Sequence, residues 1–274
     1  MKNFKKIAAI LLAVLMVVSL AACGEKKEPA PDTSDTPADV TTAAPADAPE
    51  GKKYIIASDN AFAPFEYLDT DTGEYIGIDM DILAAVAEDQ GFAYEIQNIG
   101  FDAAMNAVQS DQADAMIAGM TIKEERKLTF DFSDGYFDAG QIMVVAADSE
   151  IKSLEDLRGT NVAAKISTMG ADYAKSIAEE YGFTVTTYED SPTMYQAVMQ
   201  GTNSACFEDD PVARYSIMDQ NLELKVVGEV IDPKPYGFAV KKGENAELIA
   251  MFNAGLANIK ANGVYDEILA KYGY

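Results

Sequence analysis

The sequence predicts an α/β protein made of two similar lobes that are joined by two crossings of the chain. Strands and amphipathic helices alternate along residues 54–146, which is the pattern of a mostly parallel sheet with helices on its faces. A second alternating series begins at Ser153. The segment 236–240 is then predicted to be a strand that returns the chain to the first series. Two crossings between similar lobes predict a hinge.

The elements of the first series are predicted from hydrophobic periodicity. A helix with Ile78 on its apolar face ends near Gly91, a residue suited to a helix C-terminus. The next helix has Phe101 and Val108 on its apolar face. Short apolar runs predict four strands, at 54–57, 94–99, 114–118 and 142–146.

The second series shows several helix starts. Ser153 and Asp156 have the S-x-x-D spacing of a capped helix N-terminus, and Ser191 and Asp210 each stand directly before a proline. A last pair of helices is interrupted at Gly263. Further elements are predicted as a helix at 171–181 and strands at 161–164, 183–187 and 224–227. The predicted lobes are therefore 53–146 plus 236–274 for lobe 1, and 147–235 for lobe 2.

The N-terminus predicts export. Three lysines precede the apolar run 7–22, which is too short for a bilayer span of ~20 residues but has the length of a secretory signal. Its end, LAAC, resembles the lipobox of bacterial lipoproteins, so the sequence predicts a signal peptide at 1–22 and a lipidated Cys23. The alternative is an ordinary signal peptide that ends near a cysteine.

Residues 23–52 predict a lipid-anchored cysteine followed by a disordered tether. The segment is rich in Pro, Ala, Asp and Thr and has almost no large apolar side chains, so burial cannot offset the entropy of ordering it. The predicted location is extracytoplasmic, at the outer face of the plasma membrane or in the periplasm. The lipid alone would hold the protein at the membrane.

Composition excludes several classes of function. The net charge of -24 becomes -27 without residues 1–22, which hold three lysines and no acid, so nucleic acid is a poor partner. The chain contains no histidine, and Cys206 is left alone once Cys23 is lipidated. A disulfide, a structural zinc site and a His-dependent triad are therefore not expected. We predict no metal, no cofactor and no catalytic residue.

One arginine points to a carboxylate ligand. The segment DAMIAGMTIKEER places Arg126 just after an apolar strand, in the first turns of a short charged helix, and the chain has only three arginines. A guanidinium fork can pair bidentately with a carboxylate, which an ammonium cannot do. The alternative is a solvated helix face, because residues 123–127 are a mixed charge run.

Residues 53–274 resemble the solute-binding proteins of polar amino-acid ABC importers (bacterial solute-binding protein family 3), and among them the glutamine-binding members. The resemblance is carried, in family order, by SDNAFAPFEY, GIDMDILAAVAEDQG, GFDAAMNAV, DAMIAGMTIKEER, DFSDGY, KISTMGADYAK, FEDDPVARY, YGFAVKKG and NGVYDEILAKYG. It implies a type II periplasmic-binding (venus flytrap) fold with two hinge crossings. It also implies an amino acid bound between the lobes and delivered to a membrane permease and its ATPase, with the binding protein acting as a monomer.

The resemblance assigns site residues to lobe 1. Arg126 would bind the α-carboxylate with help from Thr121, and a carbonyl of Ala118 or Gly119 would accept from the α-ammonium. Two aromatic rings would sandwich the side chain of the ligand, with core packing as the alternative for either ring. Asp59 would offer a further acceptor. The aromatic residues are Phe62 and Phe101.

The resemblance also assigns site residues to lobe 2. Thr168 and its neighbours precede a helix, so their amides favour an anion. Asp209 would bind the α-ammonium; its alternative role is a helix cap, a position that Asp210 is predicted to fill. The full set from this lobe is Lys165, Ser167, Thr168, Met169, Glu208 and Asp209.

The identity of the ligand is the least determined point. Ile166 and Met169 stand where the glutamine-binding members have small residues, Glu208 stands where they have a histidine, and Ser204 replaces an Asp. Lys165 as a donor, with acidic acceptors nearby, favours L-glutamine or another polar neutral amino acid. A basic amino acid is the alternative.

Two other classes of function remain open. One is an enzyme like cyclohexadienyl dehydratase, built on the same scaffold with Glu208 as general acid. The other is a sensory receptor module that uses the same closure to signal.

Overall fold

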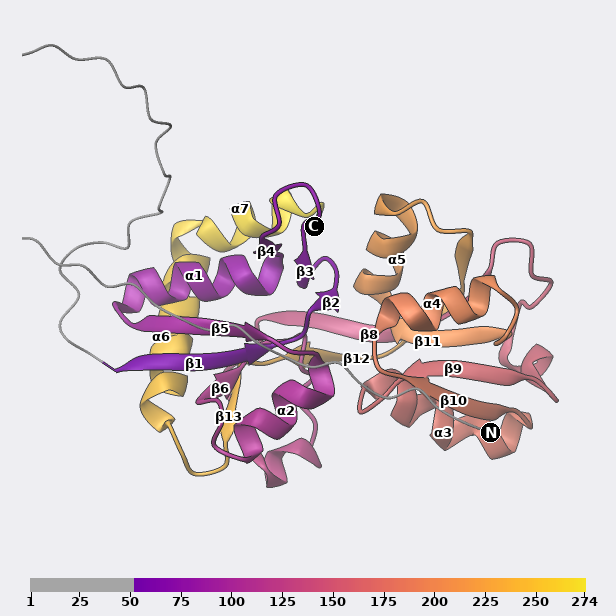
Figure 1. Ribbon diagram of the computed structural model, residues 1–274, viewed down its shortest axis with the longest axis horizontal. Helices are drawn as coiled ribbons and strands as arrows, with labels where there is room; N and C mark the ends of the chain where they lie inside the picture. Colours follow the sequence, from indigo (N-terminus) through magenta and orange to yellow (C-terminus); the bar gives the residue numbers. More distant parts are fainter. Residues whose placement is uncertain (1–51) are drawn as a thin grey trace, which may run out of the picture. The chain divides into compact units, whose positions relative to one another are not determined.

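The structure is a computed structural model that describes residues 52–274. The predicted signal peptide, Cys23 with its predicted lipidation, and almost all of the predicted tether lie outside the described residues. The described part contains two lobes, each built on a five-stranded sheet (Figure 1). No helix among these residues has both the length and the hydropathy needed to cross a membrane.

The sheet of lobe 1 has the strand order β5-β1-β6-β13-β7. Strand β1 is parallel to β5 and β6, whereas β13 is antiparallel to β6 and β7. The last strand of the chain thus lies inside this sheet, as the predicted return of the chain requires. The strands are β1 (Lys53–Ser58), β5 (Ala93–Asn98), β6 (Ala115–Met116), β7 (Phe130–Phe132) and β13 (Ala239–Lys241).

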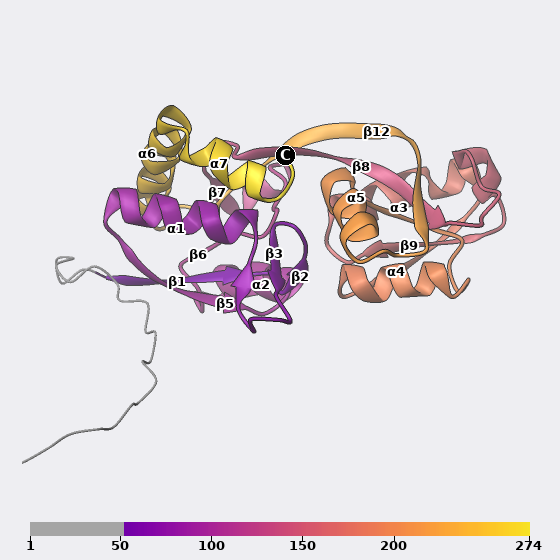
Figure 2. The ribbon, with the colours of Figure 1, turned by 90° about the horizontal axis from the view of Figure 1, so that it is seen from above.

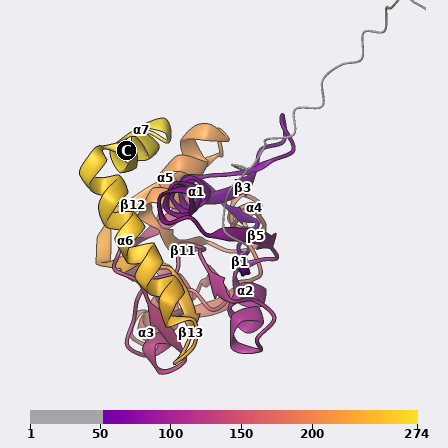
Figure 3. The ribbon, with the colours of Figure 1, turned by 90° about the vertical axis from the view of Figure 1, so that its left-hand side faces the viewer.

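Helices cover both faces of this sheet because side chains alternate along its strands. Ile56 joins the core beneath α1 and α6, and the adjacent Ala57 joins a separate core beneath α2. Figure 3 shows α6 running beside α1. Helix α1 ends at Gly91, which is left-handed with φ 69°, as predicted. The helices are α1 (Ile78–Gln90), α2 (Phe101–Gln109), α6 (Ala246–Asn262) and α7 (Val264–Lys271).

The sheet of lobe 2 has the order β10-β9-β11-β8-β12. Helix α3 covers one face, and α4 and α5 cover the other. The strands are β8 (Phe137–Ala146), β9 (Asn161–Lys165), β10 (Thr184–Tyr188), β11 (Ala205–Asp209) and β12 (Leu224–Tyr236). The helices are η2 (Leu154–Leu157), α3 (Met169–Tyr181), α4 (Ser191–Met199) and α5 (Asp210–Asp219).

Two long antiparallel strands, β8 and β12, join the lobes. They pair from Phe137 with Tyr236 to Ala146 with Leu224, and Figure 2 shows both running from one lobe to the other. The prediction that 142–146 belongs to the first sheet was wrong, because β8 pairs with β11 and β12. By hydrogen-bonded pairing β8 belongs to the second sheet, whereas Phe137 and Ala139 near its start pack against the core of lobe 1.

Strand β12 is much longer than the predicted 224–227. Gly228, Pro233 and Pro235 are residues typical of turns, but the strand continues through them, with irregularities of register between Val227, Ile231 and Lys234. The predicted strand 236–240 is accordingly divided: Tyr236 ends β12, and β13 begins at Ala239.

Two helix N-caps were predicted one residue too far toward the C-terminus, at Ser191 and Asp210. Proline occupies the second helical position in both α4 and α5, so the cap position moves back to Asp190 and Asp209. Asp190 accepts a hydrogen bond from the amide of Thr193 at 2.7 Å, whereas the Asp209 side chain makes no capping bond. The predicted capping box of Ser153 and Asp156 is confirmed.

A small three-stranded sheet was not predicted. It consists of β2 (Ala61–Phe62), β3 (Glu66–Leu68) and β4 (Tyr75–Ile76), and it leads directly into α1. Phe62 pairs with Glu66 across β2 and β3. The strands are too short to show a period of two in the sequence.

Candidate functional site

A cavity between the lobes gathers most of the predicted site residues. Its volume is about 10 Å³, which is room for the centre of roughly one water molecule. The two predicted residues that do not line it, Asp59 and Ser167, bond residues that do. The lining consists of Phe62, Phe101, Ala118, Gly119, Thr121, Arg126, Lys165, Thr168, Met169, Glu208 and Asp209.

The topology explains why these residues meet. Asp59 follows the last residue of β1, and Lys165 and Asp209 are the last residues of the parallel strands β9 and β11. In α/β sheets the carboxyl ends of parallel strands form one edge, where ligands commonly bind. Here such edges of both lobes face the same cavity.

Arg126 is buried and bonded to both lobes. Its side chain donates to the carbonyl of Thr121 at 2.8 Å and, across the cleft, to the carbonyl of Ser167 at 2.8 Å. The guanidinium carbon lies 5.3 Å from the centre of the Phe101 ring. Burial lowers the pKa of Arg126 to about 10, so it stays charged at neutral pH.

The charge run around Arg126 is not a uniform solvated face. Arg126 is 6% exposed, whereas its neighbours Glu124 and Lys127 pair with each other on the surface. The segment is a single 3₁₀ turn, η1 (Arg126–Leu128), shorter than the predicted helix.

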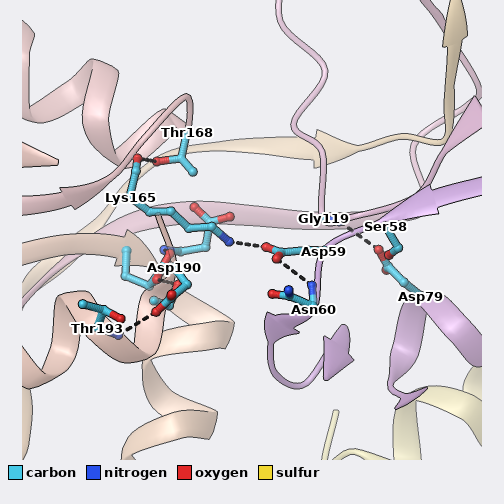
Figure 4. A network of polar contacts seen from close by, with 12 residues as sticks. Ser58, Asp59, Asn60, Asp79, Gly119, Lys165, Thr168, Asp190 and Thr193 are labelled. Carbon is cyan, nitrogen blue, oxygen red and sulfur yellow. Dashed lines mark hydrogen bonds and ion pairs between the residues drawn. The ribbon is translucent and has the colours of Figure 1, made fainter. Parts of the chain in front are cut away.

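Lys165 forms a buried ion pair with Asp59 across the cleft (Figure 4). Each side chain is 1% exposed. The Nζ atom also lies 4.5 Å from the ring centre of Phe62 and 5.6 Å from that of Phe101. Burial acts to lower the pKa of Lys165, but Asp59 and Glu208 outweigh it and raise the pKa overall. The far end of the cavity therefore holds a fixed cation.

Glu208 is a buried carboxyl that titrates near neutrality. It accepts from the hydroxyl of Ser191 at 2.6 Å and from the amide of Asp209 at 3.0 Å. Burial, followed by the charge of Asp209, raises the pKa of Glu208 to about 7. Lys165 and Ser191 act in the opposite direction. At neutral pH this group can therefore accept or donate a hydrogen bond.

Asp209 is tied to both hinge strands. Its two oxygens accept from the Gln141 amide on β8 and from the Tyr236 hydroxyl on β12. Burial raises its pKa. Sequence reasoning missed Gln141 and Tyr236, although Gln141 is the one amide in the otherwise apolar run AGQIMVV.

Ser167 and Thr168 hold the start of α3. Thr168 is its N-cap and accepts from the amide of Ala171 at 3.3 Å, so α3 begins two residues before the predicted 171. Ser167 is left-handed, with φ 63°, and its hydroxyl donates across the cleft to Asp102 at 2.6 Å. Ser167 thus contacts lobe 1 rather than the cavity.

The arrangement suits a small zwitterion. One guanidinium, one ammonium, two carboxyl groups and two aromatic rings surround a single buried cavity, and pockets for small molecules combine such apolar walls with a few fixed polar groups. Among residues 52–274, no group of three or more Asp, Glu or Cys side chains is arranged to hold a metal ion.

Comparison with known proteins identifies the family. A family model for bacterial extracellular solute-binding proteins, family 3, matches residues 54–274. The chain belongs to this family. A curated relative, the ABC transporter glutamine-binding protein GlnH of Bacillus subtilis (strain 168), is 32% identical over 273 residues, covering 98% of this chain and 97% of GlnH. The predicted family is thus confirmed.

Solved structures confirm the two-lobe fold. An ancestral arginine-binding protein bound to arginine is 37% identical and has a TM-score of 0.75, covering 81% of this chain and 98% of its own. Another structure, described as an ancestral arginine-binding protein bound to glutamine, is 36% identical with a TM-score of 0.74 over 81% and 97% of the chains. Substrate-binding domain 2 of Lactococcus lactis GlnP, in the open conformation, is 44% identical with a TM-score of 0.57 over 82% and 96%.

Proposed function

We propose that this protein captures a free polar L-amino acid, with L-glutamine favoured, between its lobes and delivers it as a monomer to an ABC importer permease and its ATPase. The observation that carries the proposal is that Arg126 from lobe 1 and Asp209 from lobe 2 line the same buried cavity. In this proposal Arg126 binds the α-carboxylate and Asp209 binds the α-ammonium. The amides of Thr121 and Thr168 add donors to the carboxylate.

The side chain of the ligand extends toward Lys165 in this proposal. The stem packs between Phe62 and Phe101, whose rings line the cavity. An amide has both a carbonyl oxygen and NH groups, so it can accept from Lys165 and donate to Glu208. A basic side chain would bring a second cation next to Lys165, whose charge is already paired with Asp59.

Binding requires the lobes to separate and close. A cavity of about 10 Å³ admits no amino acid, so entry requires opening of the contacts that cross the cleft. These include the pairs Asp59–Lys165 and Lys123–Asp172. The chain also superposes better on the arginine-bound ancestral protein than on the open GlnP domain, although it is less identical to the former. We infer closure of the lobes around the ligand by bending of β8 and β12.

A thermal-shift screen of the twenty amino acids tests the proposed ligand. We expect L-glutamine to raise the melting temperature of refolded, ligand-free protein most, because a ligand that binds only the native state stabilises it in proportion to the logarithm of its saturation. Arginine or lysine giving the largest shift, with glutamine inert, would support the basic alternative. No shift with any amino acid would contradict the proposed function.

An enzyme of the cyclohexadienyl dehydratase type is the alternative from another class. It is favoured only by Glu208, whose pKa of about 7 suits a general acid. As a residue of a binding protein, Glu208 would contact the ligand without catalysing a reaction. We expect that an amino acid incubated with the protein for a long time is recovered unchanged and in full.

We also propose that the mature protein is anchored through Cys23. The LAAC run after a lysine-flanked apolar segment is the supporting feature. Mass spectrometry of membrane-extracted protein should find acyl mass on a peptide that starts at Cys23, and Cys23→Ser should abolish it. An unmodified N-terminus at another residue would contradict the lipid anchor.

A further inference from the structure

Two buried carboxyl groups lie directly behind the cleft, and neither belongs to the predicted site. Glu66 on β3 and Asp79 in the first turn of α1 are both 0% exposed. One oxygen of Asp79, Oδ2, accepts from the backbone amide of Gly119 at 2.8 Å and from the hydroxyl of Tyr136 at 2.8 Å. Figure 4 shows the bond between Asp79 and Gly119 beside the Asp59–Lys165 pair.

The remaining oxygens of the two carboxyl groups have no donor. Both oxygens of Glu66 and Oδ1 of Asp79 are buried without a hydrogen-bond partner among residues 52–274. The backbone amide of Asp79 donates to the carbonyl of Phe65, the residue before Glu66, at 2.9 Å, which brings the two buried carboxyl groups close together. An ionised carboxylate only accepts hydrogen bonds, so two neighbouring carboxylates cannot satisfy each other. A single proton on one of them turns it into a donor and removes the conflict.

The surroundings indicate which group holds the proton. Asp79 has two donors on Oδ2 and lies at the N-terminus of α1, and both features favour its anion. Glu66 has neither. Burial, and then the charge of Asp79, raise the pKa of Glu66 well above its usual range, while burial raises the pKa of Asp79 to about 6.

No other charged group near Glu66 in the described part of the chain removes the need for this proton. Asp59 acts to raise the pKa of Glu66, and Lys165 acts to lower it. The ammonium of Lys165 is, however, paired with Asp59, so its positive charge mainly balances the charge of Asp59 and not that of Glu66. Tyr136 already donates to Asp79, and burial raises the pKa of Tyr136 well above its usual range, so it stays a neutral donor.

The pair connects two walls of the cavity. Glu66 is paired across β2 and β3 with Phe62, and Asp79 holds the amide of Gly119. Gly119 is left-handed, with φ 52°, and a Cβ atom added there would lie 2.5 Å from the Phe62 ring. The close approach of Phe62 to Gly119 therefore depends on how Glu66 and Asp79 are held together.

We propose that Glu66 is protonated at neutral pH, donates to Asp79, and is a positioning residue that fixes Gly119 and Phe62 for ligand binding. The positioning role rests on the proposed function, whereas the shared proton does not. Glu66 has a raised pKa in the folded state, so its contribution is complete below the unfolded pKa of about 4.3 and is lost as pH rises through the folded value. Ligand affinity and stability should therefore both fall on the alkaline side.

Infrared spectroscopy of the ligand-free protein tests the proton directly. At pH 7 the difference spectrum between the parent and Glu66→Gln should contain the carbonyl band of a buried carboxylic acid, because any band from Glu208 is common to both proteins and cancels. The exposed control Glu74→Gln should give no such difference band. The absence of that difference band would overturn the shared proton. This result does not depend on any ligand.

Calorimetry with L-glutamine and L-arginine across pH tests the positioning role. Glu66→Ala should weaken binding about tenfold, because it leaves a buried carboxylate oxygen of Asp79 without its donor. Glu66→Gln, whose amide supplies a permanent donor, should restore most of this loss and flatten the alkaline fall. An alkaline profile that is the same in the parent and in Glu66→Gln would overturn the role. Failure of the parent to bind any amino acid would instead contradict the proposed function.

Discussion

Replacing Arg126 with lysine is expected to weaken binding of L-glutamine by about 2 to 5 kcal/mol, although the charge is kept. The guanidinium donates to the carbonyls of Thr121 and Ser167 at the same time, and Arg126 lines the cavity. A single ammonium cannot make these bonds and also pair bidentately with a carboxylate. The ligand carboxylate would then be buried against an incomplete set of donors.

Isothermal titration calorimetry of Arg126→Lys measures this loss directly. The matched control is Arg214→Lys, since Arg214 is half exposed on α5, pairs with Asp210 and is not among the residues that line the cavity. Circular dichroism of both variants should show an unchanged fold. Equal affinity of Arg126→Lys and the parent would exclude Arg126 as the carboxylate-binding residue.

Replacing Lys165 with methionine is expected to change which amino acid binds. Closure of the lobes around a neutral ligand would then bury Asp59 without a cation, at a cost of about 3 to 5 kcal/mol. L-Arginine would bring its own cation to the place between Asp59, Phe62 and Phe101 that the ammonium of Lys165 occupies. The preference for glutamine over arginine should therefore fall by about 100-fold or more.

The double variant Asp59→Asn, Lys165→Met separates charge from packing. It removes the uncompensated carboxylate, so glutamine binding should recover relative to Lys165→Met alone, while the gain for arginine should disappear. Competition calorimetry with both amino acids on the single and double variants completes the cycle. An unchanged preference in Lys165→Met would show that the ion pair does not select the ligand.

Local sequence signals were sufficient for most elements. The stop of α1 at Gly91 and the capping box of Ser153 with Asp156 lie where the sequence places them, because each depends on residues within one or two helical turns. The errors occur where two neighbouring residues compete for one role. Asp209 and Asp210 both suit a cap, and only the place of Pro211 in the helix decides between them.

The membership of strands was less predictable. An apolar run such as 142–146 identifies a buried strand, but the run itself carries no information about which sheet it joins. The pairing of β8 with β11 and β12 assigns it to lobe 2. The full length of β12 was not predicted for a related reason. Gly228 and Pro233 are typical of turns in the sequence, and only the pairing of β12 with β8 shows that they belong to a strand.

By itself, the sequence determined the alternation of strands and helices, the family to which the chain belongs, and the set of residues that meet around the cavity. The tertiary structure decided how these residues are bonded: Lys165 with Asp59, Asp209 with the two hinge strands, and Gly119 with the buried Asp79. The reason is physical. Residue type and local spacing fix conformation over a few residues, whereas the protonation and partner of a buried charge depend on groups that folding brings from distant parts of the chain.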